Sequence, residues 1–157
     1  MKRPKYLYHA SENKDIEILE PRMQSVRDSE EGPVIFSTQD KALSTCFIVN
    51  TDSTWADMGR VNNTIYFVCN DEKRFRELDK GGAIYTLESR GFKVDPNKGM
   101  GLDEWVSKTS IRPIEKIEYE SGLEAMMENG VKVFFVDHGK FNKIMSSNDG
   151  MREILGI

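Results

Sequence analysis

The stretch YLYHAS, residues 6–11, alternates aromatic and other side chains and carries one of only two histidines among 157 residues. This alternation predicts a strand over residues 5–9 with His9 at its end. The small residues Ala10 and Ser11 follow, and they let a ligand approach the backbone closely. His9 is therefore a candidate binding residue, and the alternative is a histidine packed at the end of a core strand.

Outward from this stretch, short apolar runs rich in β-favouring residues predict further strands. They lie at residues 34–37, 64–69, 83–87, 92–94, 104–107, 114–119 and 131–136. The links between them are loops or very short helices rather than repeated crossover helices. We therefore expect an α+β fold with a split, mainly antiparallel β-sheet core of about seven strands.

Helix signals are short. Ser37 or Thr38 is expected to cap a helix over residues 42–47, and acidic first turns or apolar spacing predict others. These further helices lie at residues 71–78, 122–128, 141–145 and 151–155, the last two as one broken terminal helix. Residues 49–63 are predicted to be a loop with one helical turn around Trp55.

Length and composition bound the class of protein. We expect a single domain over residues 1–157, in which residues 119–157 add a strand and a helical tail that complete it. The net charge is −4 with a pI of about 5.3, which does not favour nucleic acid as a partner. No apolar run of signal-peptide or membrane-spanning length appears, so a cytoplasmic location without a membrane partner is expected. Cys46 and Cys69 are expected to be reduced thiols packed as small apolar residues.

The sequence lacks the motifs of several common kinds of binding and catalytic site. The glycine pairs GGA and GMG do not have the spacing of a phosphate-binding loop, and no G-x-S-x-G elbow is present. His9 and His138 are the only imidazoles, and neither a His-x-x-x-His nor a Cys-x-x-Cys pair occurs. We therefore expect no metal. His138 follows a strand and is expected to be a partly exposed turn residue.

Adjacent carboxylates at Asp103 and Glu104 mark a second candidate position. They follow a glycine-bearing loop and precede Trp105. Because neighbours on a strand face opposite sides, only one of the two is expected to point into a cleft. A carboxylate beside an aromatic can hydrogen-bond a sugar hydroxyl, and the alternative is a solvated acidic loop end.

Three pieces occur in one order: LYHAS, then VIFSTQDKAL, then DEWVSKTSIRP. Together they resemble the ADP-ribosyltransferase-like superfamily over roughly residues 5–117. The closest branch is that of poly(ADP-ribose) polymerase and diphtheria toxin, with the small bacterial rifamycin-modifying ADP-ribosyltransferases. The resemblance implies NAD as a substrate and nicotinamide held in a split antiparallel sheet.

The resemblance also implies residue roles. His9 stands where the family's histidine hydrogen-bonds a ribose hydroxyl of NAD. Ala10 stands where a glycine usually offers its backbone to the nicotinamide amide, and Ser11 is the small residue after it. Glu104 stands where the family's catalytic acid bonds the nicotinamide ribose and stabilises an oxocarbenium-like transition state.

At the middle motif the family stacks a tyrosine on nicotinamide. The counterpart here is Phe36 or, one register over, Ile35, and a phenylalanine stacks without a hydroxyl to donate. Ser37 and Thr38 match the small polar residues that follow in related sequences. Arg22 is placed where a guanidinium reaches a pyrophosphate in a bidentate way.

The resemblance implies an NAD-dependent mono-ADP-ribosyltransferase or NAD glycohydrolase with an unknown acceptor. One alternative keeps the fold as an inactive nucleotide- or protein-binding module. Another is a structural or regulatory protein with an unrelated α+β fold. The loops at residues 23–32 and 95–102 are expected to be exposed and to set substrate choice, because specificity concentrates in loops on a rigid scaffold.

Overall fold

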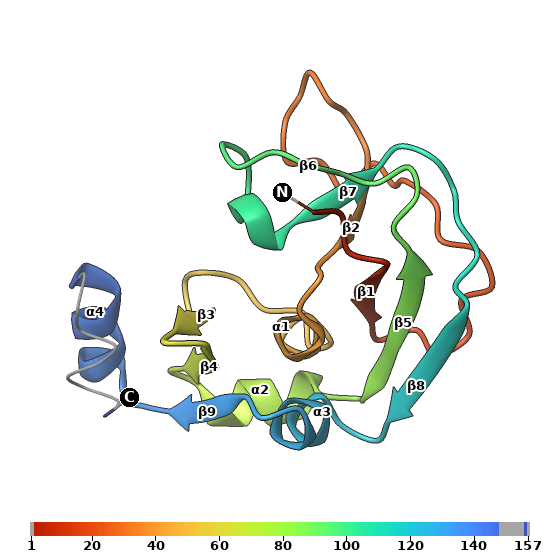
Figure 1. Cartoon of the computed structure of the whole chain (residues 1–157). Helices are drawn as coiled ribbons and strands as arrows, with labels where there is room; N and C mark the ends of the chain where they lie inside the picture. The colour runs from red at the N-terminus through yellow and green to blue at the C-terminus, as the bar shows by residue number, and fades with distance from the viewer. Residues whose placement is uncertain (1, 148–155, 157) are drawn as a thin grey trace.

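The computed structural model describes residues 2–147 and 156. In this part of the chain, three sheets of three strands each are joined by short helices, which makes the protein α+β as predicted (Figure 1). Their orders are β1-β5-β8, β2-β7-β6 and β3-β4-β9. Only the β4–β9 pair is parallel among the pairs so described, which agrees with the mainly antiparallel core that was expected.

The first sheet centres on β5 (Gly82–Glu88), which pairs with β1 (Tyr6–Ser11) and β8 (Glu115–Tyr119). The prediction that β1 ends at His9 was wrong. The register with β5 continues to Ser11, which lies opposite Ala83, so the pairing holds two residues beyond the histidine. His9 therefore lies inside the strand, where the ladder fixes its backbone.

The second sheet joins β2 (Ile35–Ser37), β7 (Trp105–Ser107) and β6 (Lys93–Val94). It is tied to the first sheet just after β2. Tyr8 and Thr38 exchange two backbone hydrogen bonds of 2.8 and 2.9 Å. This bridge brings the middle of β1 beside the end of β2. The pairing of β2 with β7 brings Glu104, which directly precedes β7, to the same end of β2.

The third sheet is built on β4 (Thr64–Cys69), with β3 (Ala56–Val61) on one side and β9 (Lys132–Phe135) on the other. Alternate residues of β4 face opposite layers, as the period of a strand requires. Phe67 packs in a cluster with α1 (Lys41–Thr45), α2 (Glu72–Leu78) and α3 (Gly122–Glu128).

Val68 points to the other face of the same sheet. There it packs against Phe141 and Ile144 of α4 (His138–Ser146), which covers that face (Figure 1). The predicted strand at residues 131–136 thus completes a sheet as β9, and α4 confirms the first half of the expected terminal helix. Its second half, residues 151–155, lies outside the described residues. His138 is exposed in the first turn of α4.

The loop prediction for residues 49–63 was wrong over its second half, which forms β3. The sequence ADMGRV has little apolar alternation, so its own pattern does not indicate a strand. The hairpin turn specifies it instead: Asn62 and Asn63 both adopt positive φ, 50° and 66°. Two such residues match the twist of a two-residue hairpin, and asparagine tolerates this region well.

The helix after β2 begins one residue earlier and ends two residues earlier than the predicted range of 42–47, and its cap is Asp40 rather than Ser37 or Thr38. The Asp40 carboxylate accepts from the backbone N–H of Leu43 at 3.2 Å. Thr38 is unable to start the helix because its backbone is paired with Tyr8 in extended form. α1 therefore covers only residues 41–45 and lies between the first and third sheets (Figure 1).

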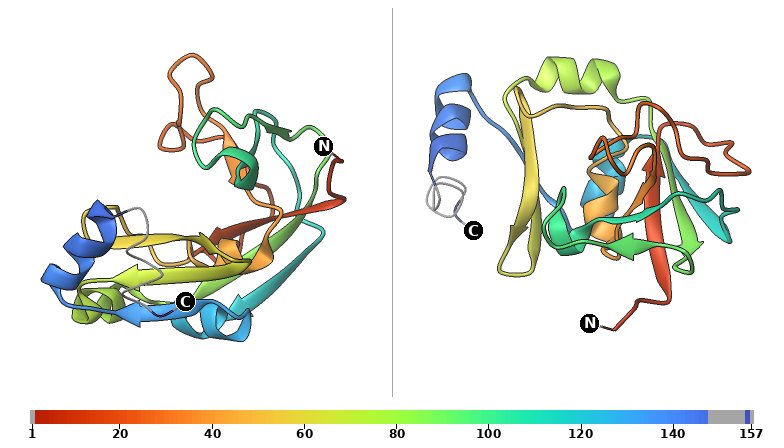
Figure 2. Two further views of the ribbon diagram at one scale, coloured as in Figure 1. Left: turned by 60° about the vertical axis from the view of Figure 1, so that its left-hand side comes forward. Right: turned by 90° about the horizontal axis from the view of Figure 1, so that it is seen from above.

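Both cysteines are buried, free thiols, as expected, and burial raises the pKa of Cys46 to about 12. In the described part of the chain, no helix combines the length and the apolar character that a membrane span needs. The segments at residues 23–32 and 95–102 project side by side at one end of the molecule (Figure 2).

Candidate functional site

A cavity of about 420 Å³ opens where β1, β2 and the segment before β7 meet. This volume lies within the range of roughly 300–1,000 Å³ that small-molecule sites occupy. Six of the eight residues predicted from the sequence line it. They are His9, Ala10, Phe36, Ser37, Thr38 and Glu104, and the other lining residues are Tyr8, Ser25, Ser44, Phe47, Asn50, Met100 and Asp103.

His9 is oriented by a hydrogen bond of 2.6 Å between its Nδ1 and the carbonyl oxygen of Phe36. Since a carbonyl only accepts, Nδ1 carries the proton. Burial lowers the pKa of His9 from its ordinary value of 6.5; the Phe36 bond opposes this shift, and the positive charge of Arg22 adds to it. The imidazole is thus neutral at pH 7, and Nε2 is an acceptor suited to a sugar hydroxyl.

Ala10 offers backbone groups to the cavity. In a strand, the N–H and C=O of successive residues point alternately to the two sides. Those of Tyr8 pair with Thr38, so those of His9 face β5 and those of Ala10 face the cavity side again. Alanine fits here without strain because the position lies within extended β1.

The structure places the middle motif in one register. Phe36 lines the cavity, whereas Ile35 is 3% exposed and packs in the core with Leu7. Ser37 and Thr38 also reach the cavity wall, but their polar groups are used internally. The Ser37 hydroxyl donates to the Trp105 carbonyl at 3.0 Å, and the Thr38 hydroxyl accepts from the backbone N–H of Asp40 at 3.2 Å.

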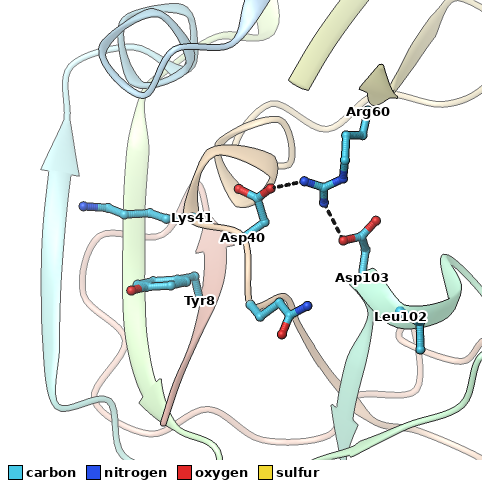
Figure 3. A pocket seen from close by; sticks show the side chains of 7 residues that line it. Tyr8, Asp40, Lys41, Arg60, Leu102 and Asp103 are labelled. Carbon is cyan, nitrogen blue, oxygen red and sulfur yellow. Dashed lines mark hydrogen bonds and ion pairs between the residues drawn. The ribbon is translucent and has the colours of Figure 1, made fainter. Parts of the chain in front are cut away.

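Asp103 lines the same cavity as Glu104, contrary to the expectation that only one acid would do so. The alternation argument fails because Asp103 ends a 3-10 turn, η1 (Gly101–Asp103), and Glu104 caps it before β7 begins. The Asp103 carboxylate bonds Arg60 of β3 at 2.6 Å. Arg60 also bonds Asp40 at 2.7 Å, across an adjoining depression of about 630 Å³ (Figure 3).

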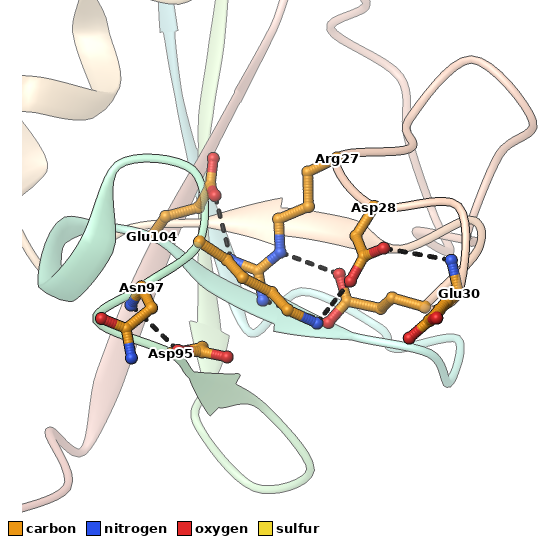
Figure 4. Close-up of polar contacts among 8 residues, drawn as sticks. Arg27, Asp28, Glu30, Asp95, Asn97 and Glu104 are labelled. Atoms are coloured by element: carbon orange, nitrogen blue, oxygen red, sulfur yellow. Dashed lines mark hydrogen bonds and ion pairs between the residues drawn. The ribbon is translucent and has the colours of Figure 1, made fainter.

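Glu104 is held by an arginine that the sequence did not indicate. Nη1 of Arg27 donates to its Oε2 at 3.0 Å. The same guanidinium bonds both carboxylate oxygens of Glu31, at 2.8 and 3.1 Å. Figure 4 shows Arg27 directed at Glu104. The hydrogen bonds to Glu31, and to a lesser extent the one to Glu104, hold the pKa of Arg27 above its ordinary value. Arg27 in turn lowers the pKa of Glu31.

Two predicted residues lie outside the cavity lining. Ser11 accepts from the backbone N–H of Asn13 at 3.0 Å and so begins the turn after β1. Arg22 is exposed, and its positive charge helps to lower the pKa of His9. The i,i+4 spacing of Arg27 and Glu31 was the one sequence signal for the missed arginine, and nothing in it points to Glu104.

No family model matches the sequence, and comparisons with curated proteins and with solved structures find no match. The geometry of the cavity is therefore the basis for a functional assignment. It assembles a neutral imidazole acceptor, a strand backbone with unspent hydrogen-bonding groups, an aromatic wall and an ion-paired carboxylate. Such a set is suited to a small polar molecule with a flat ring and hydroxyl groups.

The lowered pKa of His9 predicts a pH dependence of stability. In the unfolded chain, His9 becomes protonated as the pH falls below its ordinary pKa of 6.5. In the folded chain, its lowered pKa keeps it neutral to a lower pH. The unfolded state then binds more protons, so the free energy of unfolding falls as the pH drops below 6.5. We expect His9→Asn, whose amide still donates to Phe36, to flatten this fall. Urea unfolding at several pH values between 5.5 and 7.5 measures it.

The control for this experiment is His138→Asn, which removes the exposed imidazole of α4. A variant at His9 with the same pH slope as the wild type would show that this imidazole titrates alike in the folded and unfolded chains.

Proposed function

We propose that the protein is an NAD-dependent mono-ADP-ribosyltransferase or NAD glycohydrolase with an ADP-ribosyltransferase-like fold. One observation supports this most: His9 of β1 and Glu104 before β7, far apart in sequence, line a single cavity together with Phe36. The resemblance of the sequence assigns these same positions to NAD recognition and catalysis.

The residues present fit NAD as a substrate. The Phe36 ring provides a flat apolar wall for nicotinamide, and the Ala10 backbone provides a donor and an acceptor for its amide. Nε2 of His9 accepts from a ribose hydroxyl. The cavity of about 420 Å³ accommodates the nicotinamide riboside half, and the adenylate half then extends toward the open side of the site.

The chemistry follows from charge. Cleavage of the bond between nicotinamide and ribose builds positive charge on the ribose ring. A fixed carboxylate at Glu104 stabilises that charge in the transition state, and the stacked slot holds the leaving group in line. Water completes hydrolysis, or an acceptor nucleophile completes transfer.

Two measurements on the wild-type protein test the proposal. Titration calorimetry with NAD reports binding, and chromatographic detection of free nicotinamide reports cleavage. We expect saturable binding together with nicotinamide release that scales with protein concentration. If NAD neither binds nor is cleaved, the proposal is wrong, and His9 is a packed residue of an unrelated α+β protein.

A second candidate is a binding module without turnover. Phe36 has no hydroxyl where the family carries tyrosine, and the Glu104 carboxylate is already paired with Arg27. In this case calorimetry detects NAD, and no nicotinamide appears even after long incubation.

A further inference from the structure

Three charged side chains meet beside the cavity, and all are largely withdrawn from water. The exposed fractions are 7% for Arg27, 13% for Glu31 and 16% for Glu104. Partly buried ion pairs are screened less than exposed ones. The arrangement is therefore a built part of the site and differs from an exposed pair such as Arg76–Glu72, whose side chains are 57% and 50% exposed.

The guanidinium divides its donors unequally. Nε and Nη2 donate to the two carboxylate oxygens of Glu31. Nη1 donates to Oε2 of Glu104 (Figure 4). A bidentate grip fixes the plane of an arginine. Arg27 is thus anchored by Glu31 whatever Glu104 does, and it directs one fixed donor at the second carboxylate. Of the two Glu104 oxygens, Oε1 is left to meet a ribose hydroxyl.

The charges explain why Glu31 is part of this group. An arginine alone would cancel the negative charge that the ribose cation requires. Two carboxylates around one guanidinium keep one net negative charge in the group. Arg27 can then orient Glu104 while the electrostatic stabilisation of the transition state is retained.

The loops at residues 23–32 and 95–102 are fastened to each other at the same place. Lys98 pairs with Asp28 at 2.5 Å and so ties the two loops together, and the backbone N–H of Val34 donates to the Ser25 carbonyl at 2.9 Å, which closes the first loop on itself. Arg27 and Glu104 are therefore presented from two segments that are held together independently of their own contact.

We propose that Arg27, braced by Glu31, is the positioning residue for Glu104. It fixes the carboxylate at the cavity wall so that its second oxygen meets the substrate ribose. This inference rests on the proposed function, and it assigns to the segment at residues 23–32 a direct part in turnover.

The test uses Arg27→Gln, Arg27→Lys and Glu31→Gln in the full chain, with kcat and KM for nicotinamide release from NAD. We expect Arg27→Gln to lower kcat at least about tenfold with KM within about threefold, since misplacing a reacting group acts on the chemical step. Arg27→Lys keeps the charge and recovers part of kcat. Glu31→Gln lowers kcat because an uncompensated guanidinium then faces Glu104.

Arg76→Gln is the matched control, because it removes an arginine from an exposed ion pair away from the cavity. Thermal unfolding of each variant establishes that it is folded. If the wild type cleaves NAD and Arg27→Gln keeps its full kcat, the positioning role is overturned and the proposed function stands.

If the wild type cleaves no NAD, the proposed function fails, and a double-mutant cycle on stability decides the Arg27–Glu104 contact by itself. Arg27→Gln, Glu104→Gln and the double variant are unfolded in urea. Coupling of about threefold or more in the unfolding equilibrium constant supports the held carboxylate, and additive effects overturn it.

Discussion

Glu104→Gln is expected to reduce nicotinamide release from NAD by at least about 100-fold, the size seen when a single group that stabilises transition-state charge is removed. Glutamine has the shape of glutamate, and its amide oxygen still accepts from Arg27, which Glu31 keeps paired. The substitution therefore removes one charge from the cavity wall and leaves the fold intact. NAD affinity should stay within about threefold, because the positive charge lies on the nicotinamide ring in bound NAD and reaches the ribose ring beside Glu104 only during cleavage.

Stopped assays of free nicotinamide give the rate, and titration calorimetry gives the affinity. Asp103→Asn is the matched control, because Asp103 lines the same cavity and pairs with Arg60 instead. We expect a much smaller loss of kcat there. Equal turnover by Glu104→Gln and wild type would end the assignment, and a large loss only in Asp103→Asn would transfer the role to the neighbouring acid.

The sequence predicted those parts of the fold that local patterns specify. β4, a short run of β-favouring residues, and α3 have the predicted boundaries, Thr64–Cys69 and Gly122–Glu128. β3 was missed because its pairing is set by the Asn62-Asn63 turn, whereas its own side chains show little apolar alternation. The cap of α1 was misplaced because Thr38 bonds a strand that lies thirty residues earlier in the chain.

Some residues of the candidate site were likewise predicted from local motifs, and others were not. His9, Phe36 and Glu104 were singled out from short motifs, and the structure brings them to one cavity. Arg27 could not be found, because it lies in a charged stretch without apolar period and its partner Glu104 is 77 positions away. A long-range ion pair leaves no periodic signal, so only the arrangement of the two loops reveals it.

The loop at residues 95–102 contains a second, sharper test of the held carboxylate. Gly99 has φ +51°, and a Cβ added there would lie 1.8 Å from Oε2 of Glu104. The obstructed atom is the end of a flexible side chain, so relief is inexpensive for the fold: the carboxylate swings away. For the reaction the same movement is costly, since a displacement of about 1 Å at a reacting group can lower the rate about 100-fold.

We therefore expect Gly99→Ala to lose at least about 100-fold in kcat while its unfolding free energy falls only by the roughly 1–2 kcal/mol of backbone strain at positive φ. Gly91→Ala isolates that strain, because Gly91 has φ +84° and nothing within 4 Å of the added Cβ. Gly99→Ala should be slightly less stable in urea than Gly91→Ala, because it also loses the Arg27–Glu104 contact, and the two variants should differ strongly in turnover. Similar kcat values in both would mean that the position of Glu104 beside Gly99 is irrelevant to catalysis. A loss confined to Gly99→Ala locates the reaction at this carboxylate, because the two substitutions differ in what the new methyl group meets.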